Sequence, residues 1–387
     1  LSVTGAITFA SAFPITLGIG VGAACPVLLS SIGTNKNGKR TALIYLMNDL
    51  FGMIFWAVMF YSVHAIVHFD FMEMTMSPIS IAILNTVFRL ATVVILFPFI
   101  KWIEKLVFTL VKDTEEDREE QADFDLLEER FLKYPALAIG QSHTAINGMA
   151  RKARKNIGRA MGLFDNYTEE RYNKVQEKEN LIDKYEDKLG TYLMQLTGRD
   201  MTESQSRQVS IFLHTISDFE RLGDHAVNLS KSANELYEKK ISFSDEATYD
   251  LSVLGGAVRE ILEITVNAFS EDDVDLAIHV EPLRELINVL CNELKSRHIT
   301  RLRNGKCELK QGFAFNNILT DFERIGAHCS NVAVALLESE AEDFDTHEYQ
   351  KSIREMNNVM YREIFEAYEM KYDLGKVKKT KKSKESK

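Results

Sequence analysis

The chain of 387 residues is long enough for two or three domains, and its formal net charge of −10 is carried by the part that follows residue 112. This acidic balance argues against nucleic acid as the main partner, and four cysteines without a CxxC pair favour a reducing compartment. No Walker loop, HExxH motif or serine–histidine–aspartate order occurs, so we do not expect an enzyme.

Residues 1–112 are rich in Phe, Ile, Val, Leu and Met and carry few charges, which is typical of a membrane part. Within them, residues 41–67 and 78–100 are long and apolar enough to span a bilayer, which takes about 20 residues of helix. The loop between the two spans contains no Lys or Arg. Six basic residues lie before the first span or after the second: Lys36, Lys39, Arg40, Lys101, Lys105 and Lys112. Because cytoplasmic loops carry an excess of Lys and Arg, we expect everything after residue 112 to be cytoplasmic.

The apolar stretch of residues 5–33 precedes these spans and is interrupted by Pro14, Pro26 and a glycine-rich run at residues 18–22. In transporters, interrupted helices of this kind expose helix ends to a substrate near the middle of the membrane. We therefore predict a broken or re-entrant segment here. A continuous, glycine-rich packing helix is the alternative.

Polar side chains lie inside both predicted spans, where they are expensive and usually functional. Asn48 and Asp49 lie in the first span, and Asn85 and Arg89 lie one turn apart in the second. An arginine at this depth indicates an anion path or an ion pair, with Asp49 as one candidate partner. Structural pairing within a larger helix bundle explains these residues equally well.

Three short motifs follow one another between residues 14 and 52: a Leu-Leu-Ser-Ser-Ile-Gly element at residues 28–33, a basic turn at residues 35–40 and an Asp-Leu-Phe-Gly element at residues 49–52. This region resembles the second inverted repeat of bacterial sodium/phosphate cotransporters. The resemblance implies that residues 1–112 are the C-terminal part of a membrane transporter domain whose N-terminal half is missing from this sequence.

The same resemblance implies sodium-dependent phosphate symport across a bacterial plasma membrane, with sodium and inorganic phosphate as partners beside the lipid bilayer. The residues that we expect along the ion and substrate path are Ser30, Ser31, Asp49, Asn85 and Arg89. The family has Asn and Thr where this chain has Gly20, Ala23 and Pro26. That departure favours an alternative, a membrane-anchored phosphate-signalling regulator that no longer transports.

Residues 113–125 form a dense acidic run without apolar periodicity, so we interpret residues 113–135 as a solvated linker and the start of a helix. From residue 126 on the pattern is helical, without strand-like alternation. Three antiparallel helices joined by short loops are predicted in each of two units, residues 136–240 and 241–341. The six helices are expected over residues 136–163, 169–197, 203–239, 246–269, 273–303 and 309–339.

A last helix is predicted over residues 346–372, within a C-terminal segment of residues 342–375. The Lys-rich tail that follows, residues 376–387, is expected to be disordered and close to anionic lipid heads. The predicted fold is therefore all-α: several membrane helices with a broken segment, followed by a cytoplasmic tandem of three-helix bundles.

The two units share a repeated motif. The sequence DFERLGDHAVN, which begins at Asp218, returns 103 residues later as DFERIGAHCSN, with seven of eleven positions identical. Such self-similarity indicates a tandem duplication. In the first copy Glu220 and Asp224 are four residues apart and share a helix face, where their like charges repel unless a cation bridges them. A solvated acidic stripe is the alternative.

This doubled motif is similar to that of PhoU domains, which are tandem three-helix repeats tied to phosphate transport. The resemblance implies a regulatory module that binds metal ions through Glu/Asp-x-x-x-Asp pairs on facing helices. In the first unit these pairs are Glu179, Asp183, Glu220 and Asp224. Their oxygen ligands suit Mg, Mn or ferric iron. A regulatory protein or a second copy of this chain is the further partner that such a module implies.

The second unit departs from this pattern. Ala327 stands where Asp224 does, and Arg284 and Asn288 stand where Glu179 and Asp183 do, so that Glu323 alone remains of the four acids. We therefore expect a cation in the first unit and none, or a far weaker site, in the second. A basic cluster at residues 151–159 lacks interleaved aromatic side chains, and we interpret it as a solvated face.

Overall fold

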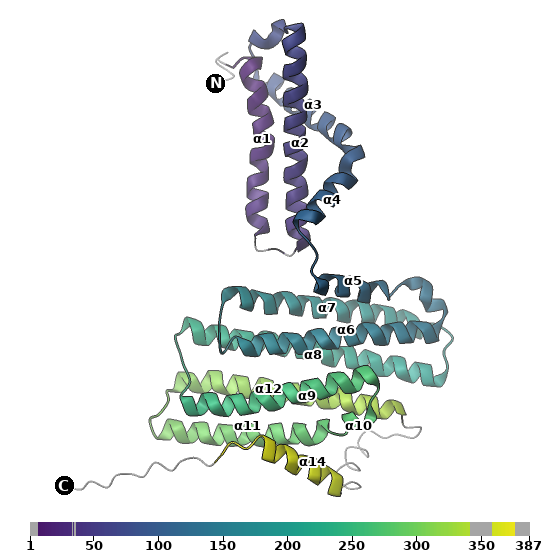
Figure 1. Ribbon diagram of the computed structural model, residues 1–387, viewed down its shortest axis with the longest axis vertical. Coiled ribbons are helices and arrows are strands. Elements are labelled where there is room, and N and C mark those ends of the chain that lie inside the picture. The colour runs from purple at the N-terminus through teal and green to yellow at the C-terminus, as the bar shows by residue number, and fades with distance from the viewer. Residues whose placement is uncertain (1–6, 33, 35, 341–357, 376–387) are drawn as a thin grey trace, which may run out of the picture. The chain divides into compact units, whose positions relative to one another are not determined.

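The structure is a computed structural model that describes residues 7–32, 34, 36–340 and 358–375. It divides into two compact units, Leu1–Arg118 and Glu119–Lys387. Within the described residues every regular element is a helix, and the single β-bridge joins Thr8 to Thr75 (Figure 1). The prediction of an all-α fold is therefore confirmed for this part of the chain.

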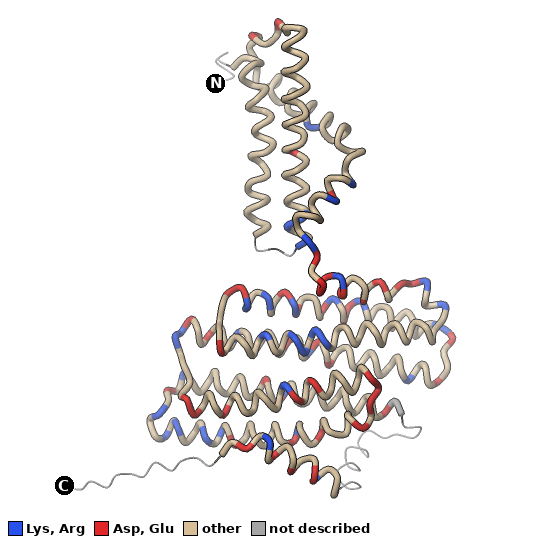
Figure 2. The backbone as a smooth tube through the Cα atoms, in the orientation of Figure 1, with Lys and Arg blue, Asp and Glu red and all other residues tan. Residues whose placement is uncertain are grey.

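The first unit consists of apolar helices, along which charged residues are few (Figure 2). They are α1 (Phe9–Ser31), α2 (Lys36–Val67), the 3₁₀ turn η1 (Asp70–Glu73), α3 (Pro78–Leu96), η2 (Phe97–Phe99) and α4 (Ile100–Leu110). By length and composition, Phe9–Ser31, Lys36–Val67 and Pro78–Leu110 could each cross a membrane. Ser77 caps α3 by accepting a hydrogen bond from the backbone N–H of Ser80, and Pro78 occupies the first helical position.

The prediction of a broken segment before the first span is wrong for the described residues. Residues 9–31 form one α-helix that contains both Pro14 and Pro26. In apolar surroundings every backbone group must find its partner inside the helix, so losing one hydrogen bond at each proline is less costly than unwinding a segment. The alternative of a packing helix describes α1 better, because Gly20 faces side chains of α2 and α3.

Basic residues at the start of α2 hold the chain that follows α4. Arg40 donates hydrogen bonds to the carbonyl oxygen of Val111 and to Asp113, and Lys36 pairs with Asp117. Burial alone would raise the pKa of Asp117, but hydrogen bonds from Lys36 and Thr114 outweigh it and lower that pKa to about 2. The basic turn of the sequence is therefore engaged by acidic residues of the same unit.

The second unit contains two groups of helices, which Figure 1 shows as neighbouring bundles, with their helices roughly aligned. The first comprises α5 (Glu115–Asp125, which begins just before the boundary between the units), η3 (Glu129–Lys133), α6 (Pro135–Gly162), α7 (Glu169–Thr197) and α8 (Glu203–Glu238). The second comprises α9 (Asp245–Glu271), α10 (Val274–Ala277), α11 (Val280–Arg303), α12 (Leu309–Glu340) and α14 (Asn358–Lys371).

The helix predictions for this unit agree with the structure to within a few residues, with two exceptions. The predicted helix 273–303 is divided into the short α10 and the longer α11. Of the predicted helix 346–372, residues 346–357 lie outside the described residues, as does the tail of residues 376–387. The apolar residues at helical spacing in the first copy of the motif, together with Leu229 just after it, form an apolar seam that is buried in the core: Phe219, Leu222, Ala226 and Leu229 are at most 1% exposed.

The acidic run is not a solvated linker, and this prediction is wrong. Most of it forms α5, whose Asp123 is buried and accepts hydrogen bonds from Lys152 at 3.2 Å and from the Tyr185 hydroxyl at 2.7 Å. Lys178, also buried, donates to Glu120 at 2.8 Å. Gly148 makes room for the Asp123 side chain, because a Cβ atom at position 148 would lie 2.1 Å from Asp123 Oδ2.

The same contact corrects the interpretation of the basic cluster as a solvated face. Lys152 is only 5% exposed, because it forms an ion pair with Asp123 and lies over the Tyr185 ring. Arg151 and Lys155, one residue before it and three after it, are exposed. The cluster thus divides into one buried anchor for α5, two exposed residues and the half-buried Arg154 and Arg159.

Candidate functional site

The two acidic faces of the first bundle lie side by side, which is the arrangement that the resemblance to PhoU domains implies. Glu220 and Asp224 lie on α8, which begins with a capping box formed by Thr202 and Gln205. Glu179 and Asp183 lie on α7. Gly223 lets the helices approach closely, because a Cβ atom there would already lie 3.3 Å from the side chain of Ile182.

Electrostatics shows that the four carboxyls act on one another. Burial raises the pKa of Glu179, Asp183 and Glu220 above their ordinary values, and in each case the Asp224 charge raises it further. Among the described residues, Arg221 is the only positively charged side chain at hydrogen-bonding distance from these carboxyls. Its Nη1 lies 3.0 Å from Asp224 Oδ2. These carboxyls, which we call the acidic cluster, are held close together with little neutralising charge.

The donor chemistry of the acidic cluster fits a hard cation. Carboxylate oxygens are the ligands that Mg, Mn and ferric iron prefer, and a cation would remove the mutual repulsion that adds to the effect of burial on the pKa values. The side chains of the described residues do not by themselves form a group of three or more ligands arranged around one ion. Closing on a cation therefore requires side-chain rotations, for which half-buried residues on a helix face have room.

The equivalent face of the second bundle is neutralised. Glu323, the remaining acid, forms an ion pair with Lys295 at 3.1 Å. Arg284 binds Glu281 on its own helix through Nε and Nη2, at 3.0 to 3.2 Å. With Ala327 on α12, no second carboxylate faces Glu323 from the motif. The two units therefore differ in charge at this face, and the predicted difference in cation binding stays a prediction.

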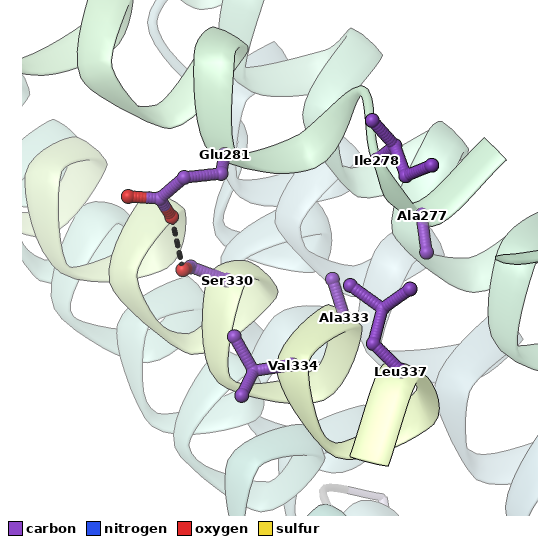
Figure 3. A pocket seen from close by; sticks show the side chains of 7 residues that line it. All are labelled: Ala277, Ile278, Glu281, Ser330, Ala333, Val334 and Leu337. Carbon is purple, nitrogen blue, oxygen red and sulfur yellow. Dashed lines mark hydrogen bonds between the residues drawn. The ribbon is translucent and has the colours of Figure 1, made fainter. Parts of the chain in front are cut away.

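Figure 3 shows how Glu281 is fixed from a second side. The Ser330 hydroxyl donates a hydrogen bond of 2.6 Å to Glu281 Oε2, beside a small cavity of about 10 Å³ lined by Ala277, Ile278, Ala333, Val334 and Leu337. A space of that size holds at most about one water molecule. Glu281, which does not stand at a position equivalent to the acidic cluster, is therefore held in a closed internal contact by Ser330 and Arg284.

The predicted transport residues divide into two places in the first unit. Asp49 and Arg89 both approach Gly20, since a Cβ atom there would lie 3.9 Å from Asp49 Oδ2 and from Arg89 Nη2. Ser30 and Ser31 lie ten residues further along α1, about 15 Å away at 1.5 Å per residue. Their hydroxyls donate to carbonyl oxygens of their own helix.

Asp49 and Arg89 do not form an ion pair among the described residues. Arg89 Nε donates to Asn85 Oδ1 at 3.4 Å, one turn earlier on α3. Asn48 donates to Asp49 Oδ1 at 3.3 Å, and Asp49 Oδ2 is buried without a hydrogen-bond partner. The structure thus brings Asp49, Asn85 and Arg89 to one level of the helices, and leaves one carboxylate oxygen unsatisfied there.

A second constellation was not predicted from the sequence. His225 Nδ1 lies 2.9 Å from Asp321 Oδ1, and His328 Nδ1 lies 2.8 Å from Asp218 Oδ1, so the two copies of the motif bind each other reciprocally. Asn331 also donates to Asp218, at 3.0 Å. The signal was present in the sequence, because both copies keep the Asp and the His while the metal-type Asp is found in one copy only.

Comparisons with known proteins agree with this architecture. The sequence model of the PhoU domain matches residues 146–233 and 251–336. The chain is 25% identical over 179 residues to the phosphate-specific transport system accessory protein PhoU homolog 1 of Thermotoga maritima, which covers 46% of this chain and 76% of that protein. It is 21% identical over 196 residues to a PhoU homolog of Clostridium acetobutylicum with the same description, covering 50% and 88%.

Among solved structures, the phosphate transport system regulatory protein PhoU from Streptococcus pneumoniae superimposes with a TM-score of 0.50 at 18% identity, covering 55% of this chain and 99% of that one. At this identity the likeness shows the fold. The expected tandem of PhoU domains is therefore confirmed for the bundles. The resemblance of residues 14–52 to a cotransporter stays a prediction.

Proposed function

We propose that this chain, whose bundles are two PhoU-like repeats, is a membrane-attached accessory and regulatory protein of phosphate transport. The observation that carries the proposal is the tandem itself, which is similar to proteins named as accessory proteins of phosphate-specific transport systems. The three long apolar helices of the first unit would attach the bundles to the membrane. Components of a phosphate transport system, or a second copy of the chain, would be the partners.

The location that fits this role is the bacterial plasma membrane, with several spans and with the bundles in the cytoplasm. The asymmetry of Lys and Arg around the spans supports this orientation. Single cysteines placed at Ser77 and Ser210, in a chain without its native cysteines, test it with an impermeant thiol reagent on intact cells. Labelling at Ser77 and not at Ser210 is expected, and the reverse pattern would overturn the orientation.

Within the regulator, the acidic cluster would hold a cation such as Mg, Mn or ferric iron. Glu179 and Asp183 would bind it from α7, and Glu220 and Asp224 from α8, so the ion would join two helices of one bundle. A bound cation would offset both the burial of these carboxyls and their mutual repulsion, which together raise their pKa values. The occupancy of this position would then set how firmly α7 and α8 are held together.

Metal analysis of the purified full-length chain tests this assignment. The variant Glu220→Gln/Asp224→Asn is expected to lose the bound metal, because it removes two of the four carboxylates. Glu323→Gln is the matched control, since it changes the equivalent motif position of the second bundle, and it should keep the metal. Equal metal content in all three proteins would show that the acidic cluster is not the site.

The regulatory role needs a test that does not depend on metal. Phosphate uptake by bacterial cells should change when the chain is expressed at abundant phosphate, and the change should be lost when residues 119–387 are deleted. This deletion variant, which is the first unit alone, must be expressed at the same level as the full chain. Identical uptake with and without the bundles, at both limiting and abundant phosphate, would count against a regulator.

Sodium-dependent phosphate symport is the second candidate, and one observation favours it. Asp49 Oδ2 is buried without a partner at the level where Arg89 lies, and a carboxylate and a guanidinium are groups that bind sodium and phosphate respectively. Saturable, sodium-dependent uptake into liposomes that hold this chain, reduced by Asp49→Asn, would support symport. No uptake into liposomes combined with an effect in cells would support the regulator.

A further inference from the structure

The two bundles meet where α8 crosses α12, and this crossing is built from the duplicated motif. Asp218 lies opposite His328, and Asp321 lies opposite His225, so the two helices run antiparallel and the contact has an approximate twofold symmetry. The four side chains are largely buried, with 11% to 20% of their surface exposed. Nothing in the proposed function uses them.

Each imidazole is held by one nitrogen and leaves the other one open. A ring that donates its Nδ1 proton to a carboxylate carries its lone pair on Nε2. Neither Nε2 atom has a hydrogen-bond partner among the described residues, and neither belongs to the buried atoms that lack one, so both keep contact with solvent. The two rings lie 5.5 Å apart between their centres, at an angle of 39°.

This arrangement matches the way proteins prepare histidine for a metal. A metal-binding imidazole usually donates its other nitrogen to a carboxylate, which fixes the tautomer and makes the ligand more basic. With zinc–nitrogen distances near 2 Å, two imidazoles on one tetrahedral ion have ring centres about 5 Å apart. The observed separation of 5.5 Å is close to that value.

We propose that His225 and His328 bind one divalent transition-metal ion, such as Zn²⁺, through their Nε2 atoms, with Asp321 and Asp218 as the carboxylates that orient them. Water would complete the coordination, because the crossing supplies two protein ligands. Imidazole nitrogens select Zn²⁺, Ni²⁺ or Cu²⁺, whereas the carboxylates of the acidic cluster suit harder cations. The histidine pair and the acidic cluster would therefore bind different metals.

A metal at this position would join the two repeats to each other, whereas a cation at the acidic cluster would join two helices of one repeat. Because the ion binds the assembled crossing and has no preformed site in the unfolded chain, it would stabilise the crossing by a free energy that grows with the logarithm of its concentration over its dissociation constant. The contact between the bundles would thus depend on the supply of a transition metal.

The test uses the full-length, tag-free chain in lipid nanodiscs, stripped with a chelator and titrated with Zn²⁺. The wild-type chain should bind one Zn²⁺ that Mg²⁺ in large excess does not displace. His225→Gln and His328→Gln should each weaken binding at least 10-fold. Asp218→Asn keeps both imidazoles and removes one orienting carboxylate, so a loss of about 10-fold to 100-fold is expected.

The matched control is His64→Gln/His68→Gln, which removes the other neighbouring pair of imidazoles, whose Nδ1 atoms are not held by carboxylates. This variant and Glu220→Gln/Asp224→Asn should both bind Zn²⁺ as the wild type does. X-ray absorption is recorded on the zinc-loaded wild type, so the result does not depend on whether a variant folds. We expect a zinc ion bound by two imidazole ligands and by oxygen ligands. Unchanged binding in His225→Gln, or a zinc spectrum without imidazole, would overturn the proposal.

Discussion

The two repeats of the second unit share one helix pattern and one motif, yet they use the motif differently. In both, the first Asp and the His bind the other copy across the crossing of α8 and α12. In the first repeat, Asp224 joins Glu220 to make a face of carboxylates that repel one another. In the second, Ala327 replaces it and Lys295 neutralises Glu323. The comparison therefore separates two sets of residues. The shared Asp and His pair the repeats with each other, whereas the second carboxylate of the motif face occurs in the first repeat only.

The repeats also differ in how each fixes its buried charges. In the first, Asp123 of α5 accepts hydrogen bonds from Lys152 and Tyr185. In the second, Asp250 of α9 forms ion pairs with two arginines, Arg297 at 3.1 Å and Arg301 at 2.7 Å. The acceptor belongs to an added helix in one case and to a helix of the bundle itself in the other. Three substitutions sharpen or break these comparisons.

The largest effect is expected for Asp250→Ala, because it leaves two guanidiniums without their buried carboxylate. Removing one partner of a buried ion pair typically costs about 3–5 kcal/mol. Urea unfolding of residues 119–375, followed by far-ultraviolet circular dichroism, measures the loss. Glu293→Ala is the matched control: it removes the exposed partner of the same Arg297 and should change the unfolding free energy by less than about 1 kcal/mol. Equal losses in the two variants would contradict the structure.

A smaller loss is expected for Gly148→Ala, which tests whether α5 is an integral part of the first repeat. The new Cβ atom would lie 2.1 Å from Asp123 Oδ2 and must displace it, and overpacking of this kind typically costs about 1–3 kcal/mol. In Gly158→Ala on the same helix nothing lies within 4 Å, so that variant should gain up to about 1 kcal/mol from helix propensity. If both variants gain stability, α5 is not anchored through Asp123.

The smallest effect is expected from Asp183→Asn in the metal-free protein, and its sign is opposite. The pKa values of Glu179, Asp183 and Glu220 are raised in the folded state, so the folded protein binds protons more readily than the unfolded chain. Their contribution to stability is therefore unfavourable at pH 7, and improves as the pH falls through the raised values towards the ordinary 3.8 and 4.5.

At pH 7 Asp183→Asn should consequently stabilise the metal-free protein by about 0.2–0.5 kcal/mol for each like-charge contact removed. The advantage over the wild type should shrink as the pH is lowered towards 4. Glu323→Gln, in the neutralised face of the second repeat, should give no such gain. Thermal unfolding of the three proteins at several pH values measures the difference, and a gain for Glu323→Gln equal to that for Asp183→Asn would erase the asymmetry.

Helical periodicity was enough to predict the bundles, whereas the placement of the acidic pairs on facing helices came from the resemblance to PhoU domains. The apolar seam through Phe219 and Leu222 defines which side of α8 is buried, and Glu220 and Asp224 then follow on a neighbouring face. These are local relations, fixed by the geometry of one helix and its neighbour in sequence.

The errors came from contacts that composition does not encode. The acidic run predicts a solvated linker because the eleven residues of α5, nine of them polar, show no apolar stripe, yet Asp123 is buried through Lys152 and Gly148. The interruption of α1 was predicted from Pro14 and Pro26, which an otherwise apolar helix tolerates. The pairing of Asp218 with His328 required knowing which helix lies opposite, and no spacing within one repeat states that.

The reciprocal bonds at the crossing also bear on the order in which the chain folds. They join residues 96 and 110 positions apart, whereas Gln176 reaches Ser230 over 54 positions and Cys291 reaches Leu319 over 28 within single repeats. Closing a longer loop has a larger entropy cost, and distant contacts form more slowly. We therefore expect each repeat to collapse on its own and the crossing to close last. During synthesis, the first repeat would then be complete while its partner was still being made.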